Sequence, residues 1–204
     1  MEYLGTDYGG WLLDLDLVPF QSTIISAGVG EDISFDRELI KRKSCQIIGI
    51  DPTLKSHRYI ESCNQLDNFT LIKKALHGVD DDVIKIFKNK NPTHVSESIL
   101  ESHHSIKKFD YYFAETTTLQ KLFETYNNIS VIKMDIEGSE YEVIESLKSI
   151  PSSICQICVE FHHFCSDRST EQTKTMIEHL KKFGFNEYHQ KGEKHLAEVT
   201  LVRR

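Results

Sequence analysis

The sequence lacks the features that would place the protein in a membrane or an oxidising compartment. No apolar run approaches the roughly 18 to 20 residues that a membrane span needs. The N-terminal MEYLGTDYGG has neither the basic nor the apolar segment of a secretory signal. The five cysteines are odd in number and lack framework spacing, which favours a reducing compartment. These absences predict a cytoplasmic protein without a membrane span.

Positive charge is also scarce. Lys and Arg number 24 against 31 Asp and Glu, which gives a net charge of −7. Affinity for nucleic-acid phosphates calls for a basic stripe, so we expect no nucleic-acid partner. The length of 204 residues with 39% hydrophobic content fits one domain over residues 1–204.

A zinc site is suggested by Cys155-x-x-Cys158, which is followed by His162, His163 and Cys165. The segment around the two cysteines reads as a buried strand, and residues three apart on a strand point to opposite faces. No second ligand pair has the spacing of structural zinc sites. We therefore expect no structural zinc.

Strand-like and helical segments alternate along the chain, which predicts an α/β fold with a mainly parallel sheet and helices on both faces. Ser169 with Gln172 predicts a capping box that opens a late helix. An irregular insertion is expected at about 79–117. The expected strands cover 22–30, 45–51, 69–76, 131–136 and 154–160, and a closing antiparallel pair covers 185–190 and 196–202.

The segment Ser26-Ala27-Gly28-Val29-Gly30 ends the first strand, where glycine lets the backbone approach a ligand closely. Asp51 ends the second strand at an interval typical of an acid that binds ribose hydroxyls. A dinucleotide site would need a third glycine, but position 33 is Ile. The acidic pair Glu31-Asp32 would repel a pyrophosphate and favours the cationic S-adenosylmethionine. The alternative is a glycine-rich turn without a cofactor.

Charged residues interrupt the strand VIKMDIEG. In an extended chain Lys133, Asp135 and Glu137 point to one side, and Glu160 and His162 share a side at the end of the next strand. If the strands are neighbours, these groups converge. A hydroxyl acceptor needs its proton removed, and His162 is our candidate base because a reference pKa of roughly 6.5 leaves a neutral form near pH 7.

The other charged residues have more than one interpretation. Glu160 orients His162 or binds sugar hydroxyls, Asp135 contacts the cofactor or a hydroxyl, and Lys133 balances Asp135 or extends its amine from a strand end. Glu137 either takes part in catalysis or only stabilises the N-terminus of the following helix. The cluster could also hold a hard divalent cation, although we favour a site without metal.

Four segments together resemble the FkbM family of S-adenosylmethionine-dependent methyltransferases, especially members associated with saccharide modification. They are SAGVGEDISFD, IIGIDPTLKS, PTHVSES and VIKMDIEGSEYEVIESL. The resemblance implies a class I methyltransferase, Rossmann-like fold whose seven-stranded, mainly parallel sheet has its last strand antiparallel. It also implies that Gly28, Gly30 and Asp51 contact the cofactor, and that His94 and Ser96 line the acceptor pocket, unless they lie in a solvated loop.

The resulting prediction is an O-methyltransferase that acts on a sugar hydroxyl of a glycan or glycoconjugate, as a homodimer or as a module of a larger polypeptide. The alternatives are another small-molecule hydroxyl, nucleic acid, or a non-catalytic nucleotide-binding scaffold. The predicted catalytic residues are His162, Glu160, Asp135 and Lys133; the cofactor residues are Ser26, Gly28, Gly30, Asp32, Asp51, Pro52 and Asp135; the substrate residues are His94, Ser96, Glu137 and Glu160.

Overall fold

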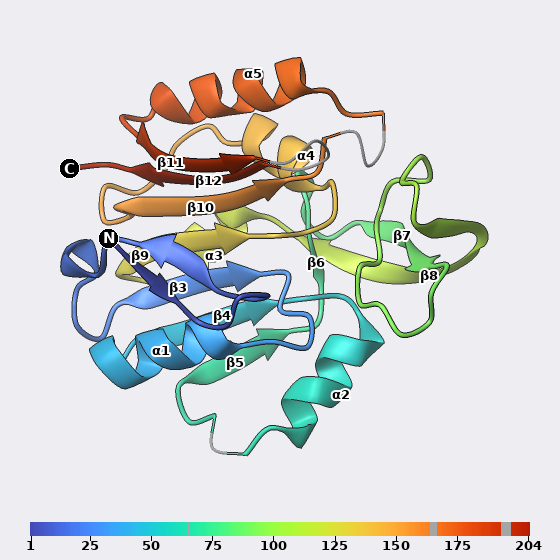
Figure 1. Cartoon of the computed structure of the whole chain (residues 1–204), viewed down its shortest axis with the longest axis horizontal. Helices are drawn as coiled ribbons and strands as arrows, with labels where there is room; N and C mark the ends of the chain where they lie inside the picture. The colour runs from blue at the N-terminus through green and yellow to red at the C-terminus, as the bar shows by residue number, and fades with distance from the viewer. Residues whose placement is uncertain (65, 164–166, 193–196) are drawn as a thin grey trace.

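The computed structural model describes residues 1–64, 66–163, 167–192 and 197–204, and its centre is a seven-stranded sheet (Figure 1). The strands lie in the order β11 (Asn186–Gly192), β12 (Ala197–Val202), β10 (Gln156–Phe161), β9 (Ile129–Met134), β3 (Thr23–Ala27), β4 (Gln46–Ile50) and β5 (Phe69–Ile72). The five strands from β10 to β5 are parallel, whereas β12 runs antiparallel to both neighbours. The predicted sheet with an antiparallel last strand is confirmed.

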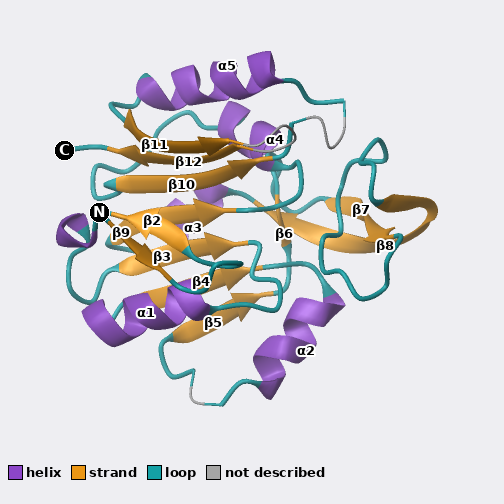
Figure 2. Ribbon diagram, in the orientation of Figure 1, coloured by secondary structure: helices purple, strands orange, loops and turns teal. Residues whose placement is uncertain are grey.

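Both faces of the sheet are covered, as Figure 2 shows. One core contains residues of α3 (Leu119–Thr125), α4 (Glu140–Glu145) and α5 (Thr170–Lys181) packed with the sheet. The other core joins α1 (Ser34–Lys43) to the N-terminal hairpin of β1 (Glu2–Leu4) and β2 (Trp11–Leu13) and to the short 3-10 helix Leu15–Leu17. Consecutive residues of β9 lie in opposite cores, because side chains alternate along a strand. Val131 packs in the core that contains α1, and Ile132 packs in the core that contains α3, α4 and α5.

Local sequence signals explain where several elements begin and end. The capping box before α5 is confirmed: the Ser169 hydroxyl accepts the Gln172 N–H and the Gln172 side chain accepts the Ser169 N–H. The helix after Gly138, α4, ends at Glu145. Leu147 and Ile150 are buried beyond that end. The helix α2 (Leu54–Ser62) begins at Thr53, whose side chain accepts the Ser56 N–H.

The insertion forms a separate three-stranded sheet of β6 (Ala75–Leu76), β8 (Ile106–Thr117) and β7 (Val83–Asn89). The single strand expected over 69–76 is therefore two strands, β5 and β6, with Lys73 and Lys74 between them. The β7–β8 hairpin projects beyond the carboxyl ends of the central strands (Figure 1). Within the described part of the chain, no helix has the length and apolar character to cross a membrane.

Candidate active site

A cavity of about 690 Å³ lies at the carboxyl ends of the central strands, within the usual size range of small-molecule sites. Its wall combines the turn after β3, the start of the segment after β4, the loop after β9, the end of β10 and the 94–105 part of the insertion. Of the predicted site residues it is lined by Gly28, Gly30, Asp32, Asp51, Pro52, His94, Ser96, Lys133, Asp135, Glu137, Glu160 and His162. The structure thus brings residues from both halves of the sequence to one site.

Ser26 is the exception among the predicted cofactor residues. It is almost fully buried within β3 and does not line the cavity. Burial raises the pKa of the neighbouring Asp36 to about 6, and hydrogen bonding by Ser26 partly opposes that shift. The cofactor contact predicted for Ser26 therefore has no support from its position, because this part of the strand faces the protein interior.

Gly28 turns the chain sharply at the end of β3. Its φ is +75°, and its N–H donates to the carbonyl of Ile50 on the neighbouring strand at 2.9 Å. A Cβ at this position would lie 1.6 Å from the carbonyl oxygen of Asp135, which is impossible without moving the backbone. Only glycine therefore allows the turn after β3 and the loop after β9 to touch.

Asp51 holds the glycine turn in place. One carboxylate oxygen accepts the N–H groups of Val29 and Gly30, each at 2.9 Å. The other accepts the backbone N–H of Thr53 at 2.8 Å and its hydroxyl at 2.6 Å. These four donors fill the lone-pair positions of an ionised carboxylate. Ribose recognition by Asp51 stays a prediction, and the structure adds a second role, that of fixing the turn that lines the cavity.

An Asp51→Asn variant separates these two roles. The amide would present an NH₂ group to backbone or hydroxyl donors, so we expect the free energy of unfolding to fall by about 1 to 3 kcal/mol. We also expect S-adenosylmethionine affinity to fall at least about tenfold, the equivalent of roughly 1.4 kcal/mol. Urea denaturation and calorimetry measure the two quantities. Asp67→Asn, at an exposed position, is the matched control. Weaker binding with unchanged stability would show that Asp51 does not hold the turn.

Lys133 also supports the glycine turn. Its ammonium group donates to the carbonyl oxygens of Ala27 at 3.2 Å and Gly28 at 2.5 Å, and lies 5.7 Å from the ring centre of Trp11. It makes no ion pair with Asp135 within 4.0 Å in the described residues. Burial raises the pKa of the Asp135 carboxyl, and the positive charge of Lys133 partly opposes that shift. Its contacts favour a structural role beneath the turn over direct participation.

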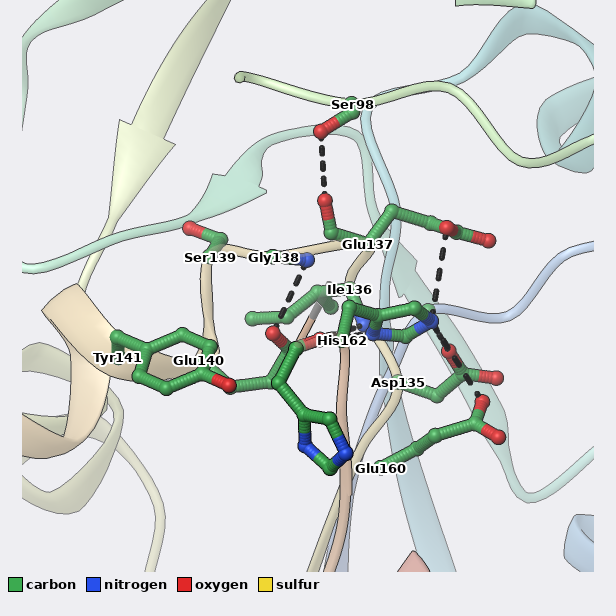
Figure 3. A network of polar contacts seen from close by, with 12 residues as sticks. Ser98, Asp135, Ile136, Glu137, Gly138, Ser139, Glu140, Tyr141, Glu160 and His162 are labelled. Atoms are coloured by element: carbon green, nitrogen blue, oxygen red, sulfur yellow. Dashed lines mark hydrogen bonds and ion pairs between the residues drawn. The ribbon is translucent and has the colours of Figure 1, made fainter. Parts of the chain in front are cut away.

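The loop after β9 is held by side chains from two directions, as Figure 3 shows. The buried carboxylate of Glu140 accepts the N–H groups of Ile136 at 2.9 Å and Gly138 at 3.0 Å. The hydroxyl of Ser98, from the insertion, donates to the carbonyl of Glu137 at 2.6 Å. Glu137 itself has a φ of +52°, which is uncommon for a residue with a side chain. Such backbone strain persists only where its surroundings impose it.

His162 lies at the centre of a cluster of acids (Figure 3). Its Nδ1 is 3.0 Å from Oε1 of Glu140. Its Nε2 faces Glu137 Oε2 at 3.5 Å, Asp135 Oδ1 at 3.7 Å and Glu160 Oε2 at 3.7 Å. The orienting partner of His162 is therefore Glu140 and not Glu160, which corrects one of the two roles that we considered for Glu160.

The charges of this cluster change its protonation. Burial would lower the pKa of His162, but the charge and hydrogen bond of Glu140 raise that pKa well above its usual value. Burial and the negative charge of Asp135 raise the pKa of Glu160 to about 8. Burial would raise the pKa of Glu137, but contact with His103 and the charge of His162 lower it to about 2. The expectation of a neutral His162 near pH 7 is wrong for the protein alone, because its neighbours favour the imidazolium.

The insertion contributes one functional candidate that the sequence did not reveal. His103 is buried, and its Nε2 lies 3.5 Å from Oε2 of Glu137. The predicted acceptor residues His94 and Ser96 line the same wall of the cavity. Nothing in the local spacing indicated His103, since it lies 34 positions before Glu137 in a segment without periodicity.

Among the described residues, one group of three could hold a metal ion, namely Asp135, Glu137 and His162. The described cysteines, among them Cys155 and Cys158 of the suggested zinc motif, belong to no such group. Cys165, the remaining candidate of that motif, lies outside the described residues.

The cavity fits the chemistry of S-adenosylmethionine. Gly30 leaves room beside the backbone, and acidic side chains from three loops give the lining a negative charge that suits a sulfonium and an ammonium group. Gly30, Asp32 and Pro52 would hold the cofactor along one wall. No basic side chain follows the glycine turn in the first residues of α1 up to Asp36, as a pyrophosphate would require.

Comparisons with known proteins agree with this geometry. The family model of the methyltransferase FkbM domain matches residues 12–187. The fold is similar to that of Methanococcus jannaschii fibrillarin, a pre-rRNA processing protein, with a TM-score of 0.55, 13% identity, and coverage of 91% of this chain and 68% of that one. A search of the curated proteins finds no match.

Two further structures share the fold. Aeropyrum pernix fibrillarin with natively bound S-adenosyl-L-methionine gives a TM-score of 0.52, 11% identity, and coverage of 94% of this chain and 70% of that one. M. capricolum TrmK with S-adenosyl-homocysteine gives a TM-score of 0.50, 9% identity, and coverage of 95% and 70%. At these identities the likeness shows the fold alone, whereas the family match covers most of the sequence. The chain belongs to the FkbM family of S-adenosylmethionine-dependent methyltransferases.

Proposed function

We propose that the protein is an O-methyltransferase acting on a sugar hydroxyl of a glycan or glycoconjugate. The observation that carries this proposal is the meeting of Asp135, Glu137, Glu160 and His162 in the cavity, directly beside the glycine turn. S-adenosylmethionine supplies an electrophilic methyl group, whose bond to sulfur breaks as the bond to the acceptor oxygen forms. The cluster offers the groups that such an acceptor needs, since carboxylates accept hydrogen bonds from hydroxyls.

The residues of the chain divide this work between them. Gly28 and Asp51 shape the cofactor wall, while Glu160 and Glu137 are placed to bind acceptor hydroxyls and orient one of them. The hydroxyl proton passes to a carboxylate of the acid group around His162 Nε2, and the imidazolium of His162 balances the charge of that group. His94 and Ser96, on the insertion, line the same cavity and are further candidates for acceptor contacts.

A neutral polyhydroxylated acceptor suits the cavity better than a nucleic acid does. The acidic lining of the cavity would repel the phosphates of a nucleic acid, and the net charge of −7 on the protein adds to that repulsion at long range. The segment after β9 reads Asp135-Ile136-Glu137-Gly138, without the Asn/Asp-Pro-Pro-aromatic sequence typical of amino methylation of bases. Both observations favour a hydroxyl acceptor.

The proposal is tested by incubating the purified chain with methyl-labelled S-adenosylmethionine, a panel of saccharides and, in parallel, RNA and DNA. We expect label in saccharide. His162→Gln removes the positive charge beside the carboxylates that take the proton, so it should lower turnover by about 10² or more, a typical contribution of acid–base catalysis, with little change in cofactor affinity. His163→Gln, whose parent ring contacts Thr173 at 3.2 Å away from the cluster, is the control. Label in nucleic acid alone, or full turnover of His162→Gln, would contradict the proposal.

A further inference from the structure

The distances from His162 Nε2 to the surrounding carboxylate oxygens are those between ligands of one metal ion, and are longer than hydrogen bonds. Its Nε2 approaches three carboxylate oxygens no closer than 3.5 Å, beyond ordinary hydrogen-bond lengths. Ligand atoms about 2.0 to 2.2 Å from one cation lie about 3.0 to 3.6 Å from each other, so these separations suit a cation between them after a small adjustment. Asp135, Glu137 and His162 each offer one atom to such a position.

The outer contacts of the two histidines fit the same interpretation. Metal-binding histidines usually use one ring nitrogen as ligand and hold the other by a carboxylate, carbonyl or similar partner. His162 Nδ1 is held by the buried Glu140 at 3.0 Å, which points Nε2 at Asp135 and Glu137. Glu140 is itself fixed by two backbone N–H groups of the loop after β9. The ring is therefore locked in the orientation that a ligand needs.

His103 provides an independent observation. Its side chain is 3% exposed, and among the described residues its buried Nε2 has no hydrogen-bond partner at ordinary length. Such a nitrogen is costly to bury unless something binds it. It lies 3.5 Å from Glu137 Oε2, on the insertion side of the cluster, while Ser105 Oγ holds its Nδ1 at 2.9 Å. A second imidazole, that of His103, thus points at the carboxylate of Glu137, which is one of the three proposed ligands.

We propose that Asp135, Glu137 and His162 bind one divalent transition-metal cation of the Mn²⁺ or Zn²⁺ type, with His103 beside it. The mixture of imidazole and carboxylate ligands favours these ions over Mg²⁺ or Ca²⁺, which prefer oxygen alone. Three protein ligands leave positions open, as in catalytic metal sites. The role of the cation rests on the proposed function: it lowers the pKa of the acceptor hydroxyl beside the cofactor. The structure here favours a metal where the sequence did not.

Metal binding is measurable without cofactor or acceptor. Untagged protein is dialysed against a chelator and titrated with Mn²⁺ alone, while electron paramagnetic resonance follows the signal of free Mn²⁺. Zn²⁺ is then added in competition. We expect one equivalent of Mn²⁺ to bind and Zn²⁺ to displace it. Failure of both ions to bind wild-type protein overturns the proposal, and the imidazolium of His162 then balances the carboxylates by itself.

Variants locate the site. Glu137→Gln should weaken Mn²⁺ binding at least tenfold, and His103→Gln should weaken it about 10- to 100-fold, the usual effect of losing a supporting partner. Glu145→Gln, which removes the same charge from an exposed position of α4, should bind as wild type does. Circular dichroism checks that each variant is folded. The metal should also raise the melting temperature of wild type but not of Glu137→Gln, so equal shifts in both would overturn the assignment.

The outcome is independent of the acceptor. Mn²⁺ binding without methyl transfer to any saccharide would support the metal site and contradict the proposed sugar acceptor. If chelator-treated protein methylates a saccharide at the full rate and binds no Mn²⁺, the metal site is contradicted and the sugar acceptor is supported.

Discussion

A Glu140→Ala variant is expected to lose about 3 to 5 kcal/mol of its free energy of unfolding, the usual result of removing one partner from a buried charged pair. Glu140 is fully buried, and three groups depend on its carboxylate: the N–H groups of Ile136 and Gly138 and the ring of His162. Alanine would leave all three without that acceptor. Urea denaturation followed by circular dichroism measures the loss.

Two further variants sharpen this result. Glu140→Gln keeps one oxygen as acceptor, so its loss of stability should lie between those of wild type and Glu140→Ala. Glu145→Ala, on the exposed side of α4, should stay within about 0.5 kcal/mol of wild type. A Glu140→Ala protein as stable as Glu145→Ala would mean that the loop after β9 does not depend on this carboxylate.

The second large effect is expected for Gly28→Ala. The new Cβ would meet the carbonyl oxygen of Asp135 at 1.6 Å, so either the glycine turn or the loop after β9 must move. Both carry cavity residues, and we therefore expect the loss of detectable S-adenosylmethionine binding and a fall in unfolding free energy above about 4 kcal/mol. Calorimetry and urea denaturation are the measurements.

Gly30→Ala is the matched control for this variant. Gly30 also has a positive φ, of +55°, but an added Cβ would meet only Val95 Cγ2, at an ordinary 3.6 Å. The substitution should cost about 1 to 2 kcal/mol, the usual penalty of a left-handed conformation. If the two alanine variants behave alike, backbone conformation decides the effect and the contact with Asp135 does not.

The meeting of Asp51, Asp135, Glu160 and His162 was predictable because it follows from a regular rule. Parallel strands end at one edge of the sheet, so residues at their carboxyl ends come together even when they lie far apart in the chain. The alternation of side chains along an extended strand then told which residues share a side. The capping box of α5 was predictable from Ser169 and Gln172, and the seven-stranded sheet with an antiparallel last strand was predictable from the resemblance to the FkbM family.

Glu140 and His103 could not be found in this way. Glu140 lies in the first turn of a helix, where a carboxylate is favoured by the helix dipole, and its spacing does not show that its side chain turns back into the preceding loop. His103 reaches the cluster from the insertion, where the sequence has no periodic pattern from which the course of the chain could be predicted. The charge of His162 was mispredicted for the same reason, since a pKa depends on neighbours in space.

Smaller errors have local causes. Lys73 and Lys74 interrupt a run that otherwise reads as one strand, and the chain changes sheets between β5 and β6. The strands β1 and β2 have three residues each, too few for a recognisable alternation.

The insertion meets the loop after β9 at Glu137, where the Ser98 hydroxyl donates to the Glu137 carbonyl and His103 Nε2 lies 3.5 Å from its carboxylate. Lys55 of α2 also holds the insertion, through the carbonyls of Pro92 and His94. The insertion side of the cavity is therefore carried by a separate sheet, which these contacts hold against the central one. If our proposed function is right, replacing the segment between these contacts offers a way to change which molecule is methylated while the strands, the glycine turn and the acid cluster stay as they are.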